Sequence, residues 1–386
     1  MNLKRWHQAV NVVFYTMPIG LAALLTRMPE VKTLLNVNSS QLGLILLGGA
    51  LGSMSTLFFA GKLISRYGTR NMLTLATWSF CVALISFAVS IANHSVLFTI
   101  IAAFVAFAGA GLADVSINLD GSQVEQQLKR TVMPRMHAFY SLGSFSGAAI
   151  GTLCVWLNVP LVTQTVVLTC IQFLIPIALW KILPGTTGKE SKHEENKPKE
   201  SYSPWKNSVV YFLGIGILGM TLAEGATNDW LVLGFKEGLN QTAANAGLAY
   251  VILQVGMVST RFFGGRVVDK IGRRRSLEIL ALAGIIGILL VTLSNNLVIA
   301  YAGTILWGAG VSMAFPLFLG AAGESSHPTK NVATVATFGY MSFLLGPPVL
   351  GLLAQTIGIL NMFYVLLGFL AISAYFARAT DRVSKA

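Results

Sequence analysis

The chain has few charged residues. Asp, Glu, Lys and Arg make up only 11% of its 386 residues, whereas soluble domains carry roughly 25%. Hydrophobic residues make up 54%, so the polar side chains are too few to cover the surface of a water-soluble protein of this length. The composition also excludes a disordered, collagen-like or disulfide-scaffold chain. A membrane protein with many crossings remains.

Cysteine and catalytic motifs are also scarce. The three cysteines, Cys81, Cys154 and Cys170, lie in apolar runs with no metal-ligand spacing, so we interpret them as small apolar groups. The chain has no G-x-x-x-x-G-K-[ST] phosphate loop and no HExxH motif. We therefore expect no enzymatic activity, no cofactor and no metal, and no ATP-driven transport by this chain alone.

Long apolar runs are abundant instead. A spanning helix needs about 20 residues, and lipid offers no partner to free backbone groups, so each run is predicted to be helical. The first run is followed by Arg27-Met-Pro29 and lacks a small-residue cleavage motif, so we interpret it as a span, not a signal peptide. The twelve predicted spans are 8–26, 40–60, 72–92, 97–119, 136–157, 161–182, 207–229, 243–263, 276–294, 297–320, 332–355 and 358–377.

The basic residues predict the orientation. With a cytoplasmic N-terminus and twelve crossings, 24 Lys and Arg fall on the cytoplasmic side, and only Arg27, Lys32 and Lys236 on the other. Basic residues are retained on the cytoplasmic side of membranes. This bias predicts that both termini are cytoplasmic. The net charge of +12 then reflects topology, and we expect no nucleic-acid partner.

One long polar segment interrupts the apolar runs. Pro184 to Pro204 has mixed charges and no apolar anchor, which is typical of a flexible linker. It predicts an N-terminal six-helix bundle at 1–183, a cytoplasmic linker at 184–204 and a C-terminal six-helix bundle at 205–386.

The two predicted halves repeat each other. Residues 61–71 read GKLISRYGTRN and residues 265–275 read GRVVDKIGRRR, at a constant offset of 204 after the second span of each half. A weaker similarity joins AFYSLGSFSG, from Ala138, to TFGYMSFLLG, from Thr337. Two similar six-helix halves suit alternating access to a central site.

These loops resemble the G-x-x-x-D-R/K-x-G-R/K-R/K signature of the major facilitator superfamily. Residues 114–125, 133–137 and 224–230, with Arg27-Met-Pro29, resemble a bacterial inner-membrane branch of that family near the fucose–proton symporters. The resemblance implies an all-α polytopic protein with the major facilitator fold, in a bacterial inner membrane. We expect a monomer.

The sequence departs from the family pattern at Ser65, where the pattern has Asp and where the second half keeps Asp269. In the superfamily that acid helps to lock the outward-facing state. The resemblance therefore leaves two alternatives: a looser lock, or a lock made by Asp114 or Asp120 with Arg66 or Arg70.

Acids inside the spans are candidates for function, because an ionisable residue at membrane depth costs at least ~2.5 kcal/mol. Two of the fifteen acids lie clearly within spans, Asp114 and Glu224, and both are candidates for proton coupling. Residue counting places Glu224 about 25 Å, and Asp114 about 8 Å, from the cytoplasmic end of its span. Asp114 is favoured as a structural lock, whereas Glu224, with no evident cation inside a span, is favoured for transport.

Polar residues recur on one face of spans 1, 4 and 7, the spans that line the central cavity by family resemblance. Lone aromatic residues in membrane helices more often pack than bind ligands. For His137, the role of a gate residue is favoured over that of a proton relay. The cavity candidates are Asn11, Tyr15, Asn118, Tyr140, Thr221, Asn228, Asp229, Tyr250 and Trp307. The cytoplasmic-gate candidates are Gly61, Arg66, Gly68, Arg70, Asp120, Glu125, Arg135, His137, Gly265, Asp269, Gly272, Arg273 and Arg274.

These observations favour a secondary active transporter that moves a small polar solute by alternating access and proton coupling. A sugar or related metabolite is the preferred candidate for the solute. The expected partners of the transporter are the solute, protons and the lipid bilayer. A proton-driven drug or metabolite efflux antiporter is the first alternative, although Gly147 in span 5 is followed by Ala148 where antiporters of this superfamily carry proline. A membrane sensor or assembly factor without transport is the second.

Overall fold

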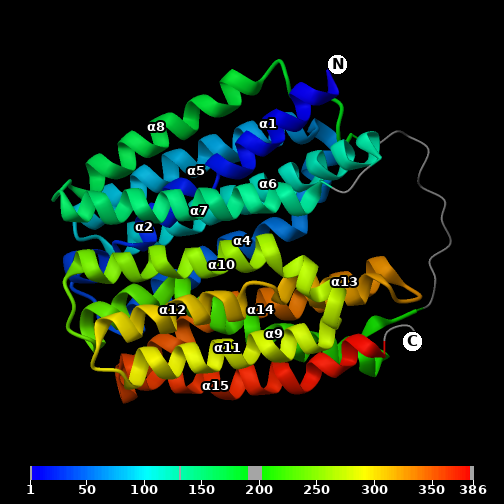
Figure 1. The fold of residues 1–386 in the computed structure, drawn as a ribbon. Helices are drawn as coiled ribbons and strands as arrows, with labels where there is room; N and C mark the ends of the chain where they lie inside the picture. Colours follow the sequence, from blue (N-terminus) through cyan, green and yellow to red (C-terminus); the bar gives the residue numbers. More distant parts are fainter. Residues whose placement is uncertain (1, 130–131, 190–201, 383–386) are drawn as a thin grey trace. The chain divides into compact units, whose positions relative to one another are not determined.

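The computed structural model describes residues 2–129, 132–189 and 202–382 (Figure 1). In these residues every regular element is a helix, which confirms the all-α prediction. The chain divides into two compact units: unit 1 comprises Met1–Val37 and Leu44–Lys199, and unit 2 comprises Asn38–Gly43 and Glu200–Ala386.

The first part of the chain, up to residue 189, forms eight α-helices. They are α1 (Leu3–Thr16), α2 (Ile19–Leu25), α3 (Met28–Leu34), α4 (Ser39–Tyr67), α5 (Thr69–Ala92), α6 (Val96–Leu128), α7 (Met133–Trp156) and α8 (Leu161–Leu179). Within unit 1, α5 packs along α6, and α1 and α2 pack along α7 (Figure 1).

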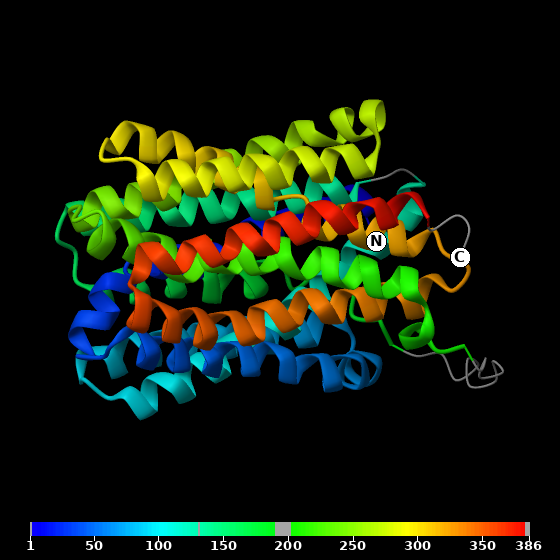
Figure 2. The ribbon, with the colours of Figure 1, turned by 90° about the horizontal axis from the view of Figure 1, so that it is seen from below.

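Residues 202–382 form seven α-helices and three short elements. They are η1 (Pro204–Lys206), α9 (Ser208–Leu233), the π-helix η2 (Gly234–Gly238), α10 (Ala243–Ile271), α11 (Arg273–Leu293), α12 (Leu297–Val311), α13 (Ala314–Gly323), α14 (Pro328–Ile357), α15 (Ile359–Phe376) and η3 (Ala377–Asp381). Figure 2 shows α9, in green, between α14 in orange and α15 in red.

Length and composition qualify eleven stretches of the described chain as membrane spans. A twelfth is added when α3 and residues 39–56 of α4, which meet at a bend of 113°, are counted as one span. The prediction of a polytopic helical membrane protein is therefore confirmed, with eleven or twelve candidate spans.

Predicted span 1 is two helices, because α1 ends at Thr16 and α2 begins at Ile19. Pro18 lies in the break, where it has no N–H to donate and where its ring obstructs the preceding turn. The freed carbonyls are satisfied from α8: Nε2 of Gln172 donates to the carbonyl oxygens of Thr16 at 2.7 Å and Met17 at 3.2 Å. Gly20 makes room for this amide, since a Cβ there would lie 2.4 Å from Oε1 of Gln172.

Predicted span 10 is also broken, between α12 and α13 at Ser312 and Met313. Predicted span 4, in contrast, is too short, because α6 continues from residue 119 to Leu128. Its polar end resembles a loop in sequence, but Ile117, Asp120 and Val124 are fully buried on one face. Burial of that face holds the extra turns in the helix.

Close helix contacts in each unit depend on glycine. In unit 1 a Cβ on Gly52 of α4 would lie 2.0 Å from the carbonyl oxygen of Phe104 in α6. In unit 2 a Cβ on Gly256 of α10 would lie 2.3 Å from the carbonyl oxygen of Ile305 in α12. Residues 52 and 256 differ by the repeat offset of 204, so small residues bring equivalent helices together in both units.

Candidate functional site

An ion pair lies inside unit 2. Nη2 of Arg261, on α10, lies 3.0 Å from Oε1 of Glu224, on α9. Nε of the same guanidinium donates to the carbonyl oxygen of Ser312 at 3.0 Å. The two side chains are 27% and 13% exposed. One guanidinium thus joins a carboxylate of α9 to the backbone at the break between α12 and α13.

The expectation that Glu224 has no evident cation partner is therefore wrong. Arg261 lies within predicted span 243–263, although the count of basic residues includes it among the 24 on the cytoplasmic side. It is ten residues before Ile271, the last residue of α10, or about 15 Å along the helix. The signal was present: an arginine inside an apolar run needs an anion, and Glu224 is the acid that lies clearly within a predicted span of the same half.

Two other polar residues of α9 also bind partners within unit 2. Oγ1 of Thr221 lies 2.9 Å from Oγ of Ser342 on α14, and the hydroxyl of Tyr250 on α10 donates to Oδ1 of Asn228 at 2.9 Å. Thr221 and Tyr250 are almost fully buried. They join α9 to its neighbours on both sides of Glu224.

Two further cavity candidates of unit 2 lie away from these contacts. Trp307 is fully buried, and its ring contacts Phe363 edge to face at 5.0 Å. Asp229 is half-buried near the end of α9. The structure therefore brings Thr221, Glu224 and Asn228 onto one bonded face, to which it adds Arg261.

In unit 1, Asp114 and Asn118 bind each other one turn apart on α6. Nδ2 of Asn118 donates to Oδ1 of Asp114 at 3.0 Å and to its carbonyl oxygen at 2.9 Å. The carboxylate is half-buried. The expected position of Asp114, 8 Å from the helix end, is wrong, because α6 runs fourteen residues further, about 21 Å.

The remaining cavity candidates of unit 1 lie on α1 and α7. The hydroxyl of Tyr15 donates to Oγ of Ser146 at 3.0 Å. Oδ1 of Asn11 is buried and has no hydrogen-bond partner among the described residues. Tyr140 lines a mostly apolar cavity of about 40 Å³, together with Thr16 and Gln172 at the break in span 1.

The signature loops have the same backbone in both units. Gly68, between α4 and α5, has φ +83°, and Gly272, between α10 and α11, has φ +82°. These positive values favour glycine, which explains why both loops keep it. The other two signature glycines, Gly61 and Gly265, have open space where a side chain would be.

The residue after Gly68 binds an acid within α6, and the residue after Gly272 binds the acid that directly follows α13. Oγ1 of Thr69 donates to Oδ1 of Asp120 at 3.0 Å in unit 1. In unit 2, Nη1 and Nη2 of Arg273 each donate to an oxygen of Glu324 at 2.6 Å. Both residues of each pair are 204 positions from their counterparts, a coincidence in the sequence that we did not use.

Asp120 and Glu324 differ in their environments. Asp120 is fully buried, and its Oδ2 has no hydrogen-bond partner among the described residues. Glu324 is 60% exposed, and the hydrogen bonds and charge of Arg273 hold the pKa of its carboxyl below the usual range.

Neither Arg66 nor Arg70 pairs with Asp114 or Asp120 in the described part of this structure, so the alternative lock stays a prediction. The guanidinium of Arg70 stacks over Trp180 at 4.4 Å, and that of Arg66 lies 5.2 Å from the ring of Tyr67. Neither forms an ion pair with an acid in the described part of the chain.

Four other gate candidates have varied surroundings. Oε2 of Glu125 accepts the N–H groups of Val132 and Met133 at 2.6 and 2.8 Å, so this carboxylate caps the start of α7. Arg135 and Asp269 are exposed. The ring of His137 lies 5.2 Å from that of Phe14.

The last gate candidate, Arg274, belongs to a surface cluster of unit 2. Its Nε donates to Glu278 at 2.8 Å, and its Nη1 donates to Asp381 at 3.4 Å. All three side chains are at least 36% exposed, so solvent weakens these ion pairs.

The predicted linker is described only at its ends. At its start, the carbonyl oxygen of Thr187 accepts the N–H of Thr69 at 2.9 Å, beside Asp120. At its other end, the hydroxyl of Tyr202 donates to Oδ1 of Asn331 at 2.9 Å. Residues 190–201 lie outside the described chain, and the boundary at 184–204 stays a prediction.

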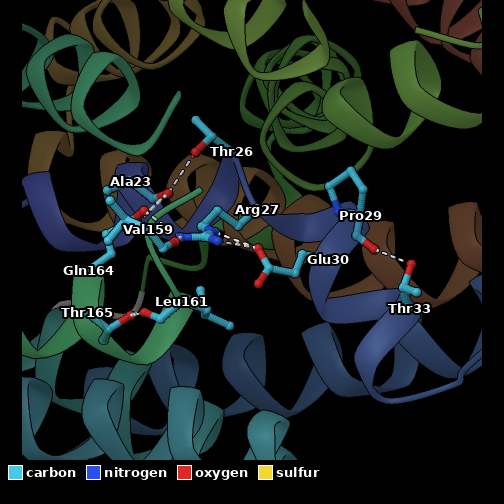
Figure 3. A network of polar contacts seen from close by, with 10 residues as sticks. All are labelled: Ala23, Thr26, Arg27, Pro29, Glu30, Thr33, Val159, Leu161, Gln164 and Thr165. Carbon is cyan, nitrogen blue, oxygen red and sulfur yellow. Dashed lines mark hydrogen bonds and ion pairs between the residues drawn. The ribbon is translucent and has the colours of Figure 1, made fainter. Parts of the chain in front are cut away.

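A polar network missed in the sequence surrounds Arg27 in unit 1 (Figure 3). Its Nε and Nη2 both lie 2.6 Å from Oε2 of Glu30. Its Nη1 donates to the carbonyl oxygen of Val159 at 2.7 Å and to Oε1 of Gln164 at 3.1 Å. Arg27 is 5% exposed. Since its bonds reach the loop between α7 and α8, we interpret the network as structural.

The family model described as Major Facilitator Superfamily matches residues 10–339 and 235–385. The chain belongs to the major facilitator superfamily. This confirms the resemblance inferred from the two signature loops, and it identifies the chain as a member of a membrane transporter family.

Three similar proteins illustrate the match. An uncharacterized MFS-type transporter of Yersinia pestis is 27% identical, over 90% of this chain and 88% of that protein. A structure of the nucleoside transporter NupG has a TM-score of 0.78 at 13% identity, covering 98% of this chain and 100% of NupG. The fucose:proton symporter FucP of E. coli has a TM-score of 0.67 at 14% identity, covering 97% and 98%. At these identities the solved structures show the fold alone.

Proposed function

We propose that this chain is a proton-coupled secondary active transporter that moves a small polar solute by alternating access. The preferred candidate for the solute is a sugar or related metabolite. The transporter acts in a bacterial inner membrane with both termini in the cytoplasm. The family supports the transport class, and the basic bias of the predicted loops supports the orientation. NupG and FucP, named for nucleosides and for fucose with a proton, support the solute class only by analogy.

The ion pair of Glu224 and Arg261 is the observation that carries proton coupling. It lies within two membrane-spanning helices, where charges are rare and concentrate on ion and substrate pathways. Glu224 can release or bind a proton, whereas Arg261 stays charged. We assign Glu224 the main proton-binding role, and Asp114, whose bonded partner is the neutral Asn118, the second.

Polar residues on α9, α1 and α6 are the proposed substrate contacts. Asn228 on α9, Tyr15 on α1 and Asn118 on α6 offer amide and hydroxyl groups of the kind that orient polar solutes. The loops at Gly68 and Gly272 are the proposed gate, each closed within its own unit by the bond to Asp120 or Glu324. This division of roles follows the alternating-access scheme of two repeated halves.

Proton-driven transport in proteoliposomes tests the proposal. Purified protein is reconstituted, a panel of sugars, sugar acids and amines is added, and the internal pH is followed with a fluorescent dye. We expect at least one solute to drive proton movement in wild-type protein, and Glu224→Gln to abolish it while solute exchange without a pH gradient continues.

Glu278→Gln is the matched control. It removes one exposed carboxylate in the second turn of α11 and is expected to leave proton movement unchanged. Coupled flux in Glu224→Gln at the wild-type rate would remove Glu224 from the mechanism. Folded wild-type protein that moved no solute of the panel in either direction would contradict the transport proposal itself.

A further inference from the structure

Arg261 imposes a charge requirement on unit 2. A guanidinium does not lose its proton in proteins, so a positive charge stays on α10 whatever the pH. In this structure the carboxylate of Glu224 supplies the opposite charge at 3.0 Å. The two charges cancel as long as Glu224 is ionised.

Proton binding at Glu224 changes this balance. A protonated Glu224 with a neutral solute leaves the pair with a net charge of +1 inside a membrane-spanning bundle, which is costly. A protonated Glu224 with a monoanionic solute restores a net charge of zero, the same as in the empty site.

We propose that Arg261 is the recognition residue for a small organic anion, whose carboxylate or phosphate group takes the place of Glu224 on the guanidinium when Glu224 binds a proton. This inference rests on the proposed function and narrows its solute class to acids such as sugar acids. Proton and anion are then positively linked, and each raises the affinity for the other by the same factor.

The geometry of Arg261 suits this exchange. Its Nε is held by the carbonyl oxygen of Ser312 at 3.0 Å, which keeps the guanidinium in place while its partner on the Nη side changes. A planar guanidinium binds carboxylate and phosphate groups through parallel hydrogen bonds. The side chain is 27% exposed and Glu224 is 13% exposed, so the pair lies at the edge of the unit 2 core rather than within it.

Among the described residues of the helices around α9, Arg261 is the cation that pairs with Glu224. Helices α10, α12, α13, α14 and α15 pack on α9, and Arg261 is the charged group that acts on Glu224. Asp229 is the nearest acid on α9 itself, five residues further along. Of the other charged or titratable side chains on these helices, Tyr364 is half-buried, and the rest are exposed or bound elsewhere, at Tyr250, Arg266, Asp269, Lys270, Tyr301, Lys330, Tyr340, Tyr375 and Arg378.

Unit 1 has a neutral group at the corresponding place. Its carbonyl 204 positions before Ser312 is that of Ala108, which accepts a hydrogen bond from Oγ1 of Thr56 at 2.9 Å. The same backbone position is therefore bonded by a hydroxyl in unit 1 and by a guanidinium in unit 2. Simple support of this carbonyl therefore does not require a charge.

Matched pairs of ligands test the inference. Purified protein is titrated with D-gluconate against D-glucitol, with D-galacturonate against D-galactose, and with glycerol 3-phosphate against glycerol, at pH 5.5 and pH 8. Binding is measured by thermal stabilisation and calorimetry, and proton uptake by the pH change in weak buffer. We expect at least one anion to bind at least tenfold more tightly than its neutral partner, with uptake of up to one proton per anion.

Variants separate binding from folding. Glu224→Gln imitates the protonated acid, so we expect it to bind the anion at least as tightly as wild type, without proton uptake. The double variant Arg261→Gln with Glu224→Gln removes both charges, leaves no charge unpaired, and is expected to fold but to lose at least tenfold in anion affinity. Arg266→Gln, an exposed arginine on the same helix, is the control and should bind as wild type.

Three results would overturn the inference: no anion of the panel binds, the neutral partners bind as tightly, or the double variant keeps its anion affinity. Proton-coupled transport of a neutral sugar that depends on Glu224 would leave the proposed function standing and remove only the anion. Failure of all transport in the proteoliposome assay would remove the proposed function instead.

Discussion

The two units place different chemistry on equivalent backbone positions. After the signature glycine, unit 1 has a hydroxyl, Thr69, bonded to a fully buried acid, whereas unit 2 has Arg273 bonded to an exposed one. The carbonyl at 108 or 312 is bonded by a hydroxyl in unit 1 and by Arg261 in unit 2. Unit 1 therefore supports these positions with neutral donors, and unit 2 supports them with permanent charges.

The helix breaks follow the same division. The amide of Gln172 satisfies the carbonyls freed in span 1, and the guanidinium of Arg261 satisfies the carbonyl of Ser312 at the break in span 10. A neutral donor is sufficient to support a helix break. The charge in unit 2 adds a property that support alone does not need, namely dependence on an anion.

Removing the donor to the equivalent carbonyls is expected to give the largest contrast. Arg261→Gln should lower transport at least tenfold and lower the unfolding temperature, because it leaves Glu224 ionised without its guanidinium. Thr56→Val in unit 1 should cost only about 1 kcal/mol, the net value of one hydrogen bond, and keep transport. Thermal unfolding in detergent and vesicle transport measure both. Equal losses in the two variants would remove the contrast.

The break in span 1 gives the next largest effect. Gln172→Leu should destabilise the protein by about 2 kcal/mol, because two partly buried carbonyls lose their donor. Gln172→Glu separates shape from donor capacity, since a carboxylate keeps the size but cannot donate, and it should be at least as destabilising. Unfolding temperatures of the two variants measure this, and wild-type stability in either would show that the break needs no donor.

Breaking the neutral–acid pair Thr69–Asp120 should cost more stability than breaking the fully charged pair Arg273–Glu324. Thr69→Val leaves the fully buried Asp120 without the Thr69 hydroxyl, and we expect a cost of about 1–3 kcal/mol. Arg273→Met breaks an exposed ion pair, and we expect less than about 1 kcal/mol. If the unfolding free energies rank in the opposite order, burial is not the deciding factor.

The pH dependence of the exposed pair is the smallest expected effect. Because the pKa of Glu324 is lower in the folded protein than the unfolded value of about 4.3, its contribution is complete above the unfolded value and is lost as pH falls through the folded one. Glu324→Gln should therefore be slightly less stable than wild type at pH 7, and the difference should vanish toward pH 3. A difference that grew on acidification would contradict the assignment.

The sequence predicted the fold class and one half of the ion pair. Apolar run length located the spans, and an acid inside such a run identified Glu224. Arg261 was not predicted as the partner of Glu224, because it lies near the end of its predicted span, close to a basic loop. Pro18 signals the first helix break locally, whereas Ser312-Met313 contains neither proline nor glycine, and that break is visible only in the structure.

The partners of the acids were identified from the structure. Asp120 resembled a loop residue, because helix α6 is extended by burial against neighbouring helices rather than by local propensity. Its partner Thr69 could have been found from the repeat, since both members of Thr69–Asp120 and of Arg273–Glu324 obey the offset of 204. The proton-coupling, cavity and gate roles of the named residues stay predictions.

Proton uptake on ligand binding tests the central claim most directly. Wild-type protein and Glu224→Gln are titrated with the tightest-binding anion of the panel in weak buffer near pH 7. The account predicts proton uptake by wild type, up to one per anion, and none by Glu224→Gln, with anion affinity retained. Anion binding with no proton uptake in wild type, or equal uptake in both proteins, would contradict it.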